Sequence, residues 1–197
     1  MKRNLMNIRW GLAIATSAMA VLVAITVKTS VSASAPAQIS KAEMVKRGDY
    51  LVNAMGCTDC HTPHKMGPNG PEPDNDLFLS GHPADMTLPA PPEPVGPWIV
   101  SFAATSTAAA GPWGISYSQN LTPDPETGVA GSYTEEQFVM TIREGKKQGR
   151  GRAILPPMPW PVFRNLTDDD LKAIYAYLKT VKPVRNKVPE PVIAEMK

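Results

Sequence analysis

The stretch Cys57-Thr58-Asp59-Cys60-His61 decides how the rest of this sequence is interpreted. It has the C-x-x-C-H spacing of a haem c attachment site, in which two thiols on one helical turn can each add to a haem vinyl group. The adjacent His61 can then turn its imidazole onto the iron from the same side. A redox-active dithiol would instead follow a β-strand in a βαβ unit, and here a helical pattern precedes the motif. Since Cys57 and Cys60 are the chain's only cysteines, we predict one covalently attached haem c.

The second axial ligand of the iron is sought among ten methionines. Met158 lies in Leu155-Pro156-Pro157-Met158-Pro159-Trp160-Pro161, just before the last helical pattern. Prolines fix φ and limit the freedom of the unfolded chain, so this loop can hold a weak thioether on the iron. Methionine–histidine ligation raises the reduction potential and suits electron transfer. We therefore predict Met158 as the distal ligand, with Pro157 also in contact with the haem.

Three other interpretations of the distal side stay open. Met158 could merely pack under Trp160. His82 or His64 could bind the iron instead. His82, in Gly81-His82-Pro83, is the better of the two, because His64 is too close to His61 to reach the opposite haem face easily.

Apolar periodicity predicts helices over about 41–55, 135–144 and 168–181. Ser40, Thr134 and Thr167 stand where their side chains can cap the first backbone N–H groups. No stretch shows convincing period-two alternation, so we expect a mostly α fold. Residues 65–118 form a long segment rich in Pro, Gly and Ala, which we expect to be irregular rather than sheet. The proline-rich chain after Pro183 is expected to lie extended over the surface.

Residues 1–35 resemble an export segment. Three positive charges precede an apolar run over 11–27, and Ala33-Ser34-Ala35 fits a small-residue cleavage pattern. The alternative is an uncleaved anchor, although the run is at the short limit for a membrane span. Either way we expect a periplasmic protein, or one anchored to the outer face of the cytoplasmic membrane. We expect the cytochrome-like domain to cover 36–188 and a tail to cover 189–197.

The net charge excludes a polybasic nucleic-acid binder. The formal charge is +2 for the whole chain, but residues 1–35 hold four cations and no acids. The remainder has 16 cations against 18 acids, which gives a net charge of −2. We expect no nucleic-acid partner.

These motifs resemble those of class I c-type cytochromes. The stretches 50–57, 119–128 and 155–160 are specifically similar to domains of the cytochrome subunits that accompany quinoprotein alcohol dehydrogenases. The resemblance covers about residues 41–188. It implies a class I cytochrome c fold, mostly α, with three or more helices around one covalent haem and a long Pro-rich irregular insertion. Those subunits usually carry several haem domains, whereas this chain has one C-x-x-C-H motif.

The resemblance also implies roles for individual residues. It makes His61 the proximal ligand and Met158 the distal ligand of the haem iron. It places Asn120 and its neighbours near the haem edge and propionates. The final helix is implied to pack across the first one near Gly48.

The leading functional hypothesis is a monohaem carrier of single electrons between redox partners outside the cytoplasm, and not an enzyme. One alternative is a haem enzyme or gas sensor with an open distal position. Another is a haem-containing structural or docking subunit of a larger redox complex, with residues 65–118 as the docking segment. A basic loop before Met158 could steer a redox partner of unknown identity. Its cations are Lys146, Lys147, Arg150 and Arg152.

Overall fold

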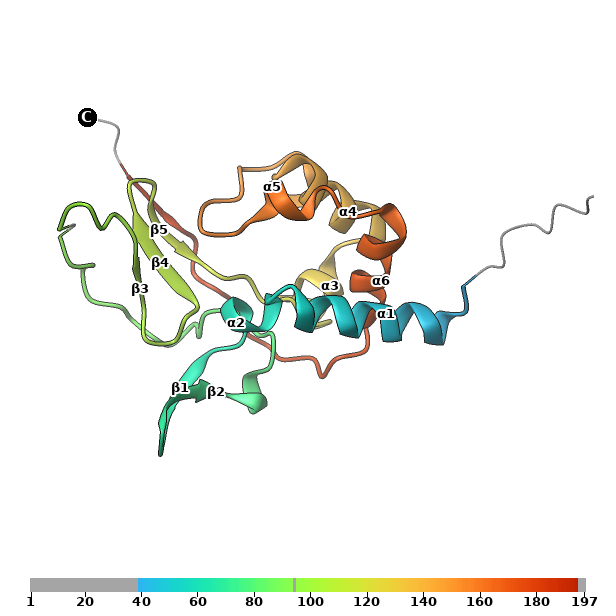
Figure 1. Cartoon of the computed structure of the whole chain (residues 1–197), viewed down its shortest axis with the longest axis horizontal. Coiled ribbons are helices and arrows are strands. Elements are labelled where there is room, and N and C mark those ends of the chain that lie inside the picture. Colours follow the sequence, from blue (N-terminus) through green and yellow to red (C-terminus); the bar gives the residue numbers. More distant parts are fainter. Residues whose placement is uncertain (1–38, 94, 195–197) are drawn as a thin grey trace, which may run out of the picture. The chain divides into compact units, whose positions relative to one another are not determined.

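The computed structural model describes residues 39–93 and 95–194. Three of its helices carry most of the core: α1 (Lys41–Ala54), α4 (Glu135–Glu144) and α6 (Asp168–Leu178) (Figure 1). Capping boxes start α1 and α4, and the Thr167 side chain accepts a hydrogen bond at the start of α6. The three helices expected from periodicity are confirmed, although α6 ends about one turn earlier than expected.

Helices α1 and α6 cross in direct contact at Gly48. A methyl group on Gly48 would lie 1.9 Å from the carbonyl oxygen of Ala173, so the two backbones touch. An ion pair between Arg47 Nε and Asp170 Oδ1, 2.8 Å long, joins the same two helices. The expectation that the last helix packs across the first near Gly48 is confirmed. The core of the described residues comprises Leu51, Val52, Leu79, Ala130, Phe138, Ile142, Leu171, Ile174 and Leu178.

Three shorter helices connect this framework. The motif itself forms α2 (Cys57–His61), which α1 reaches through Gly56 at a φ of +70°. Helix α3 (Val129–Ser132) precedes α4, and α5 (Trp160–Phe163) follows the proline-rich loop of Met158. Short 3-10 turns occupy Asn75–Leu77 and Lys147–Gly149.

The segment expected to be irregular carries most of two antiparallel sheets, so the expectation that it holds no sheet is wrong, whereas residues 78–93 and 95–100 form neither helix nor strand and are irregular as expected. Strand β1 pairs with β2, and a second sheet has the strand order β3-β4-β5-β6. Alternation gave no signal, because β4 is built only of alanine and glycine and presents no polar face. Hairpin pairing between neighbouring segments joins β3, β4 and β5, and only β6 is added from a distant segment of the chain. The strands are β1 (His64–Gly67), β2 (Gly70–Pro73), β3 (Ser101–Phe102), β4 (Ala108–Gly111), β5 (Gly114–Tyr117) and β6 (Val192–Ile193).

The chain from Val184 to Ile193, here called the C-terminal strap, ties the insertion to the helical core (Figure 1). It runs extended, and its end forms β6, with Val192 opposite Ile115 of β5. Near its start, the Asn186 side chain donates to the carbonyls of Ser80 and His82, at 2.7 and 2.8 Å. The strap therefore contacts the inserted segment at two separate places, Ser80–His82 and β5.

The predicted export segment lies outside the described residues. Among the helices of 39–93 and 95–194, none is both long enough and apolar enough to cross a membrane. The domain boundaries at 35/36 and 188/189 stay predictions.

Candidate haem site

A cavity of about 440 Å³ lies between the helices and the larger sheet. Its size falls within the roughly 300–1,000 Å³ of small-molecule and cofactor sites. Its walls are mostly apolar and come from α1, α2, α4, α6, the β3–β5 sheet and the loop before α5. The four residues predicted to hold the haem, Cys57, Cys60, His61 and Met158, all line this one cavity.

Helix α2 presents the two thiols to the cavity. Neither cysteine forms a disulfide. Burial raises the pKa of the Cys57 thiol to about 11, and burial also raises the pKa of Cys60. Both are therefore neutral thiols near pH 7. Within the described ranges, no group of three His, Cys, Asp or Glu side chains is placed to hold a metal ion. The pair therefore does not have the donors of a thiolate metal site.

His61 is fixed in one orientation. Its Nδ1 lies 2.7 Å from the carbonyl oxygen of Gln119, which can only accept, so Nδ1 carries the proton. Burial lowers the pKa of His61, while the bond to Gln119 acts in the opposite direction. The ring is therefore neutral near pH 7 with an unprotonated Nε2, the form in which histidine binds a metal.

The loop of Met158 is held at both sides. Ser116 of β5 donates from Oγ to the Pro156 carbonyl at 2.6 Å. At the other side Gly145, at a φ of +62°, ends α4 and lies so close under the Trp160 ring that a methyl group there would collide with it. Met158 and Pro157 both line the cavity between these two supports. The sequence did not predict these supports, because each joins residues far apart in the chain.

The competing histidines are placed elsewhere. Of the chain's three histidines, all within the described residues, only His61 lines the cavity. His82 is wholly buried against Thr107, and burial lowers its pKa. His64 Nδ1 lies 3.4 Å from the carbonyl oxygen of Thr105. Neither ring is placed to compete with Met158.

Residues 45–182 match the family model described as Cytochrome c. The chain belongs to the cytochrome c family. Membership implies a covalently bound haem c, and the thiols, imidazole and apolar walls of the cavity fit that group.

Similar proteins include cytochrome subunits of several dehydrogenases. The chain is 33% identical over 160 residues to the cytochrome c subunit of a quinone alcohol dehydrogenase from Gluconobacter oxydans (strain 621H), covering 80% of this chain and 26% of that subunit. It is 34% identical over 141 residues to the fructose dehydrogenase cytochrome subunit of Gluconobacter japonicus, covering 71% and 22%. It is 32% identical over 142 residues to the gluconate 2-dehydrogenase cytochrome c subunit of Pantoea cypripedii, covering 72% and 24%. The chain thus spans about a quarter of the length of these relatives.

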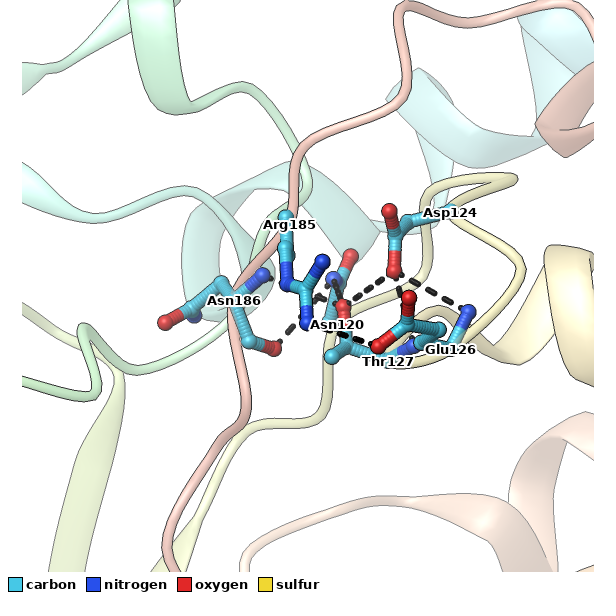
Figure 2. A network of polar contacts seen from close by, with 6 residues as sticks. All are labelled: Asn120, Asp124, Glu126, Thr127, Arg185 and Asn186. Carbon is cyan, nitrogen blue, oxygen red and sulfur yellow. Dashed lines mark hydrogen bonds and ion pairs between the residues drawn. The ribbon is translucent and has the colours of Figure 1, made fainter.

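Asn120 does not reach the cavity of this cytochrome. Its side chain is 1% exposed and is not part of the cavity wall. Its Nδ2 donates to Thr127 Oγ1 at 3.1 Å (Figure 2). The same Nδ2 donates to the Val184 carbonyl at 2.8 Å, while Oδ1 accepts from Thr122. The side chain thus holds the C-terminal strap, and its position gives no support to the predicted contact with the haem.

The inserted sheet forms one wall of the cavity. Phe102, Ala109 and Ser116 stand side by side in the register of β3, β4 and β5, and all three line the cavity. Sequence reasoning missed this wall. One available signal was charge, because the chain carries no charged residue from 94 to 123.

The predicted basic loop divides into two pairs of cations. Lys147 and Arg152 line the cavity and lie 3.8 and 3.7 Å from the carboxylate of Glu190 on the strap. All four residues are exposed, but Lys146 and Arg150 neither line the cavity nor make an ion pair with another described residue. The two pairs therefore face different surroundings.

Proposed function

We propose that this cytochrome holds one haem c and carries single electrons between redox proteins outside the cytoplasm, as a subunit or partner of a dehydrogenase. The observation that carries the proposal is that Cys57, Cys60, His61 and Met158 line one apolar cavity that no other histidine reaches. When bound, the haem supplies a ferric–ferrous couple. The relatives that are dehydrogenase subunits support the choice of partner class.

Each residue has a defined task in this proposal. Cys57 and Cys60 tether the group covalently. His61 offers Nε2 to the iron, with its ring held by Gln119, and Met158 offers its sulfur from a braced loop. With both axial positions filled, no site is left for a substrate or gas, which favours a carrier over an enzyme or sensor. Apolar walls exclude water and disfavour the additional charge of ferric iron, so they raise the potential.

The cations at the cavity have two proposed roles. Lys147 and Arg152 line the cavity and can pair with the carboxylates of the haem. Lys146 and Arg150 point to solvent and can attract an acidic patch on a redox partner. Electron transfer with the native partner should therefore slow as salt rises, and changing Lys146 and Arg150 to Glu should slow it further at low salt. A rate indifferent to both changes contradicts the steering role.

Export remains part of the proposal, through residues 1–35 as signal or anchor. N-terminal sequencing of the protein from its source cells distinguishes cleavage near Ala33–Ala37 from an anchor. Recovery of haem-loaded protein from the cytoplasm contradicts both versions.

A docking role in a larger complex is favoured by one observation. Val95, Trp98, Ile99, Val100 and Phe102 are exposed apolar side chains in one short stretch of the insertion, which is typical of an interaction surface. A Trp98→Ser variant should bind its complex more weakly with an unchanged haem spectrum. If the variant assembles with the native complex as the unmodified protein does, the docking role is excluded and only the carrier role remains.

Variants of Met158 test the ligand set. Met158→Ala should remove the sulfur–iron absorption of the ferric protein and lower the potential, because the thioether favours ferrous iron. Met66→Ala is the matched control, since Met66 is 76% exposed on β1 and does not line the cavity. Mass spectrometry should find one haem per chain that denaturation does not release. A Met158→Ala spectrum identical to the native one would exclude Met158 as the ligand.

A further inference from the structure

His82 is a buried polar residue that the proposed ligand set does not use. Its side chain is 0% exposed, and it does not line the cavity. Its partner Thr107 is also fully buried, and Thr105 continues the cluster, with 2.8 Å between the two threonine hydroxyls. Burying polar groups costs free energy unless they are hydrogen-bonded. The residues next to this cluster in the chain, Gly81 and Gln119, form hydrogen bonds with His61, so the cluster can influence the position of His61.

His82, Thr107 and Ser118 form a closed triangle of hydrogen bonds. The ring Nδ1 of His82 is bonded to Thr107 Oγ1 at 2.9 Å. The backbone N–H of Ser118 donates to the Thr107 carbonyl at 2.8 Å, and the backbone N–H of His82 donates to the Ser118 carbonyl at 2.9 Å. The His82 ring also packs on Tyr117, with 4.9 Å between ring centroids. Three chain segments are thereby locked to one another.

Both hydrogen bonds that orient His61 come from residues adjacent to this triangle. Gln119, which follows Ser118, accepts from His61 Nδ1 at 2.7 Å. Gly81, which precedes His82, donates from its backbone to the His61 carbonyl at 2.8 Å. A methyl group on Gly81 would lie 2.6 Å from the carbonyl carbon of Gln119, so Gly81 packs directly on the peptide that holds the ring. Movement in the triangle would therefore reach His61 through two contacts.

We propose that His82 is a positioning residue for the axial ligand, acting through the Thr107–Ser118 triangle to hold the Gln119 carbonyl against His61 Nδ1. The inference rests on the proposed role of His61 as an iron ligand. A carbonyl held at this nitrogen makes the imidazole a stronger donor, which stabilises ferric iron and lowers the potential. Loosening the triangle should weaken that bond and favour the ferrous state.

The test compares three variants of the full-length, haem-loaded protein. His82→Leu removes the hydrogen bond to Thr107. His82→Asn places an amide where the ring has Nδ1 and should restore that bond. Thr107→Val removes the hydroxyl with little change of shape. Leu51→Ala is the control for general destabilisation, because Leu51 is buried in the core but does not line the cavity.

His82→Leu should keep the sulfur–iron absorption and raise the ferrous-to-ferric ratio at a fixed ambient potential by about threefold, the scale expected for part of one hydrogen bond. The His61 Nδ1 proton, followed by NMR in the ferrous state, should exchange with solvent faster. His82→Asn should restore both properties, and Thr107→Val should shift both in the same direction by less. Should His82→Leu fail to fold, a shift in Thr107→Val beyond that of Leu51→Ala supports the proposal.

The positioning role would be overturned if the ferrous-to-ferric ratio and the exchange rate of the His61 Nδ1 proton were the same in Thr107→Val, His82→Leu and Leu51→Ala. Native protein without a histidine–methionine spectrum would instead overturn the proposed ligand set. The two failures are distinguishable, because the second is visible before any variant is made.

Discussion

The two walls of the cavity are built on different physical principles. The helical wall, with α1, α4 and α6, is organised by local signals: caps, apolar periodicity and one close crossing at Gly48. The sheet wall, with β3–β5, consists of short strands that pair as consecutive hairpins and are tied to the core by the C-terminal strap, a distant segment whose β6 pairs with β5. Packing should therefore dominate the stability of the first wall, and hydrogen bonds to distant segments should dominate that of the second.

The largest effect is expected from filling the helix crossing. Gly48→Val would drive a branched side chain into the backbone of α6, where even a methyl group would lie 1.9 Å from the Ala173 carbonyl oxygen. We expect a loss of about 3 kcal/mol or more of unfolding free energy, measured by urea denaturation. Ala54→Val, at an exposed position of the same helix, should cost far less. Equal costs for the two variants would mean that the crossing is not a packing constraint.

The Asn186 bonds of the strap should stabilise the inserted segment and not the helical wall. Asn186→Ala would leave the Ser80 and His82 carbonyls without their donor, at a cost of about 1–3 kcal/mol. Amide hydrogen exchange should accelerate in residues 79–84 while α1 and α6 keep their protection. Asn165→Ala is the control, since its amide bonds two carbonyls in an exposed turn, and it should cost about 0.5 kcal/mol or less. If amide hydrogen exchange accelerated equally in residues 79–84 and in α1 and α6, the two parts would not be stabilised independently.

The difference between the walls also explains what the sequence could predict. Helix positions and caps follow from neighbours three or four residues apart, so 41–55 and 135–144 were found nearly to the residue. The cysteines and His61 share one short motif, and the prolines mark the loop whose Met158 lines the same cavity. The partner of Ser116 lies 40 residues away, and that of Asn186 lies 106 residues away. No local pattern encodes such pairs, so these contacts and the bond from Asn120 to the strap were not predicted. The β3–β5 hairpins do join neighbouring segments, but their strands are short and lack period-two alternation, so the sheet wall was missed as well.

A smaller, local effect is expected where Ser116 of the sheet wall supports the loop of Met158, the proposed distal ligand. Ser116→Ala removes the hydroxyl that donates to the Pro156 carbonyl at 2.6 Å, a loss of about 1 kcal/mol. Met158 should then be displaced from the ferric iron by added imidazole about fivefold faster, because 1 kcal/mol corresponds to about that factor. Ser132→Ala removes a similar hydroxyl–carbonyl bond from α3, at a residue that does not line the cavity, and should leave the displacement rate unchanged. Equal rates in the two variants would show that the sheet does not brace the loop.

The smallest effect is expected from the ion pair between the first and last helices. Arg47 is half-exposed, so solvent screens its bond to Asp170, which should add little to the stability at neutral pH. The side-chain bond to Arg47 holds the pKa of Asp170 below its usual value of 3.8, although slight burial acts in the opposite direction. A carboxyl group whose pKa is lower in the folded state stabilises the protein above its unfolded pKa, and this contribution is lost as the pH falls through the folded pKa.

Arg47→Gln should therefore cost a small part of the unfolding free energy at pH 7. The cost should shrink as the pH falls below about 4, because the unfolded chain then takes up a proton at Asp170 that the native protein binds only at lower pH. Raising the salt concentration at pH 7 should also shrink the difference, because exposed charges are screened. Lys46→Gln removes a charge from the neighbouring exposed position, where no ion pair forms among the described residues, and should be close to neutral at both pH values. A cost for Arg47→Gln that stays constant with pH and salt would assign its effect to packing of the long side chain. In that case the contact between α1 and α6 would depend on packing at the surface as well as in the core, and the charge of Arg47 would contribute nothing to it.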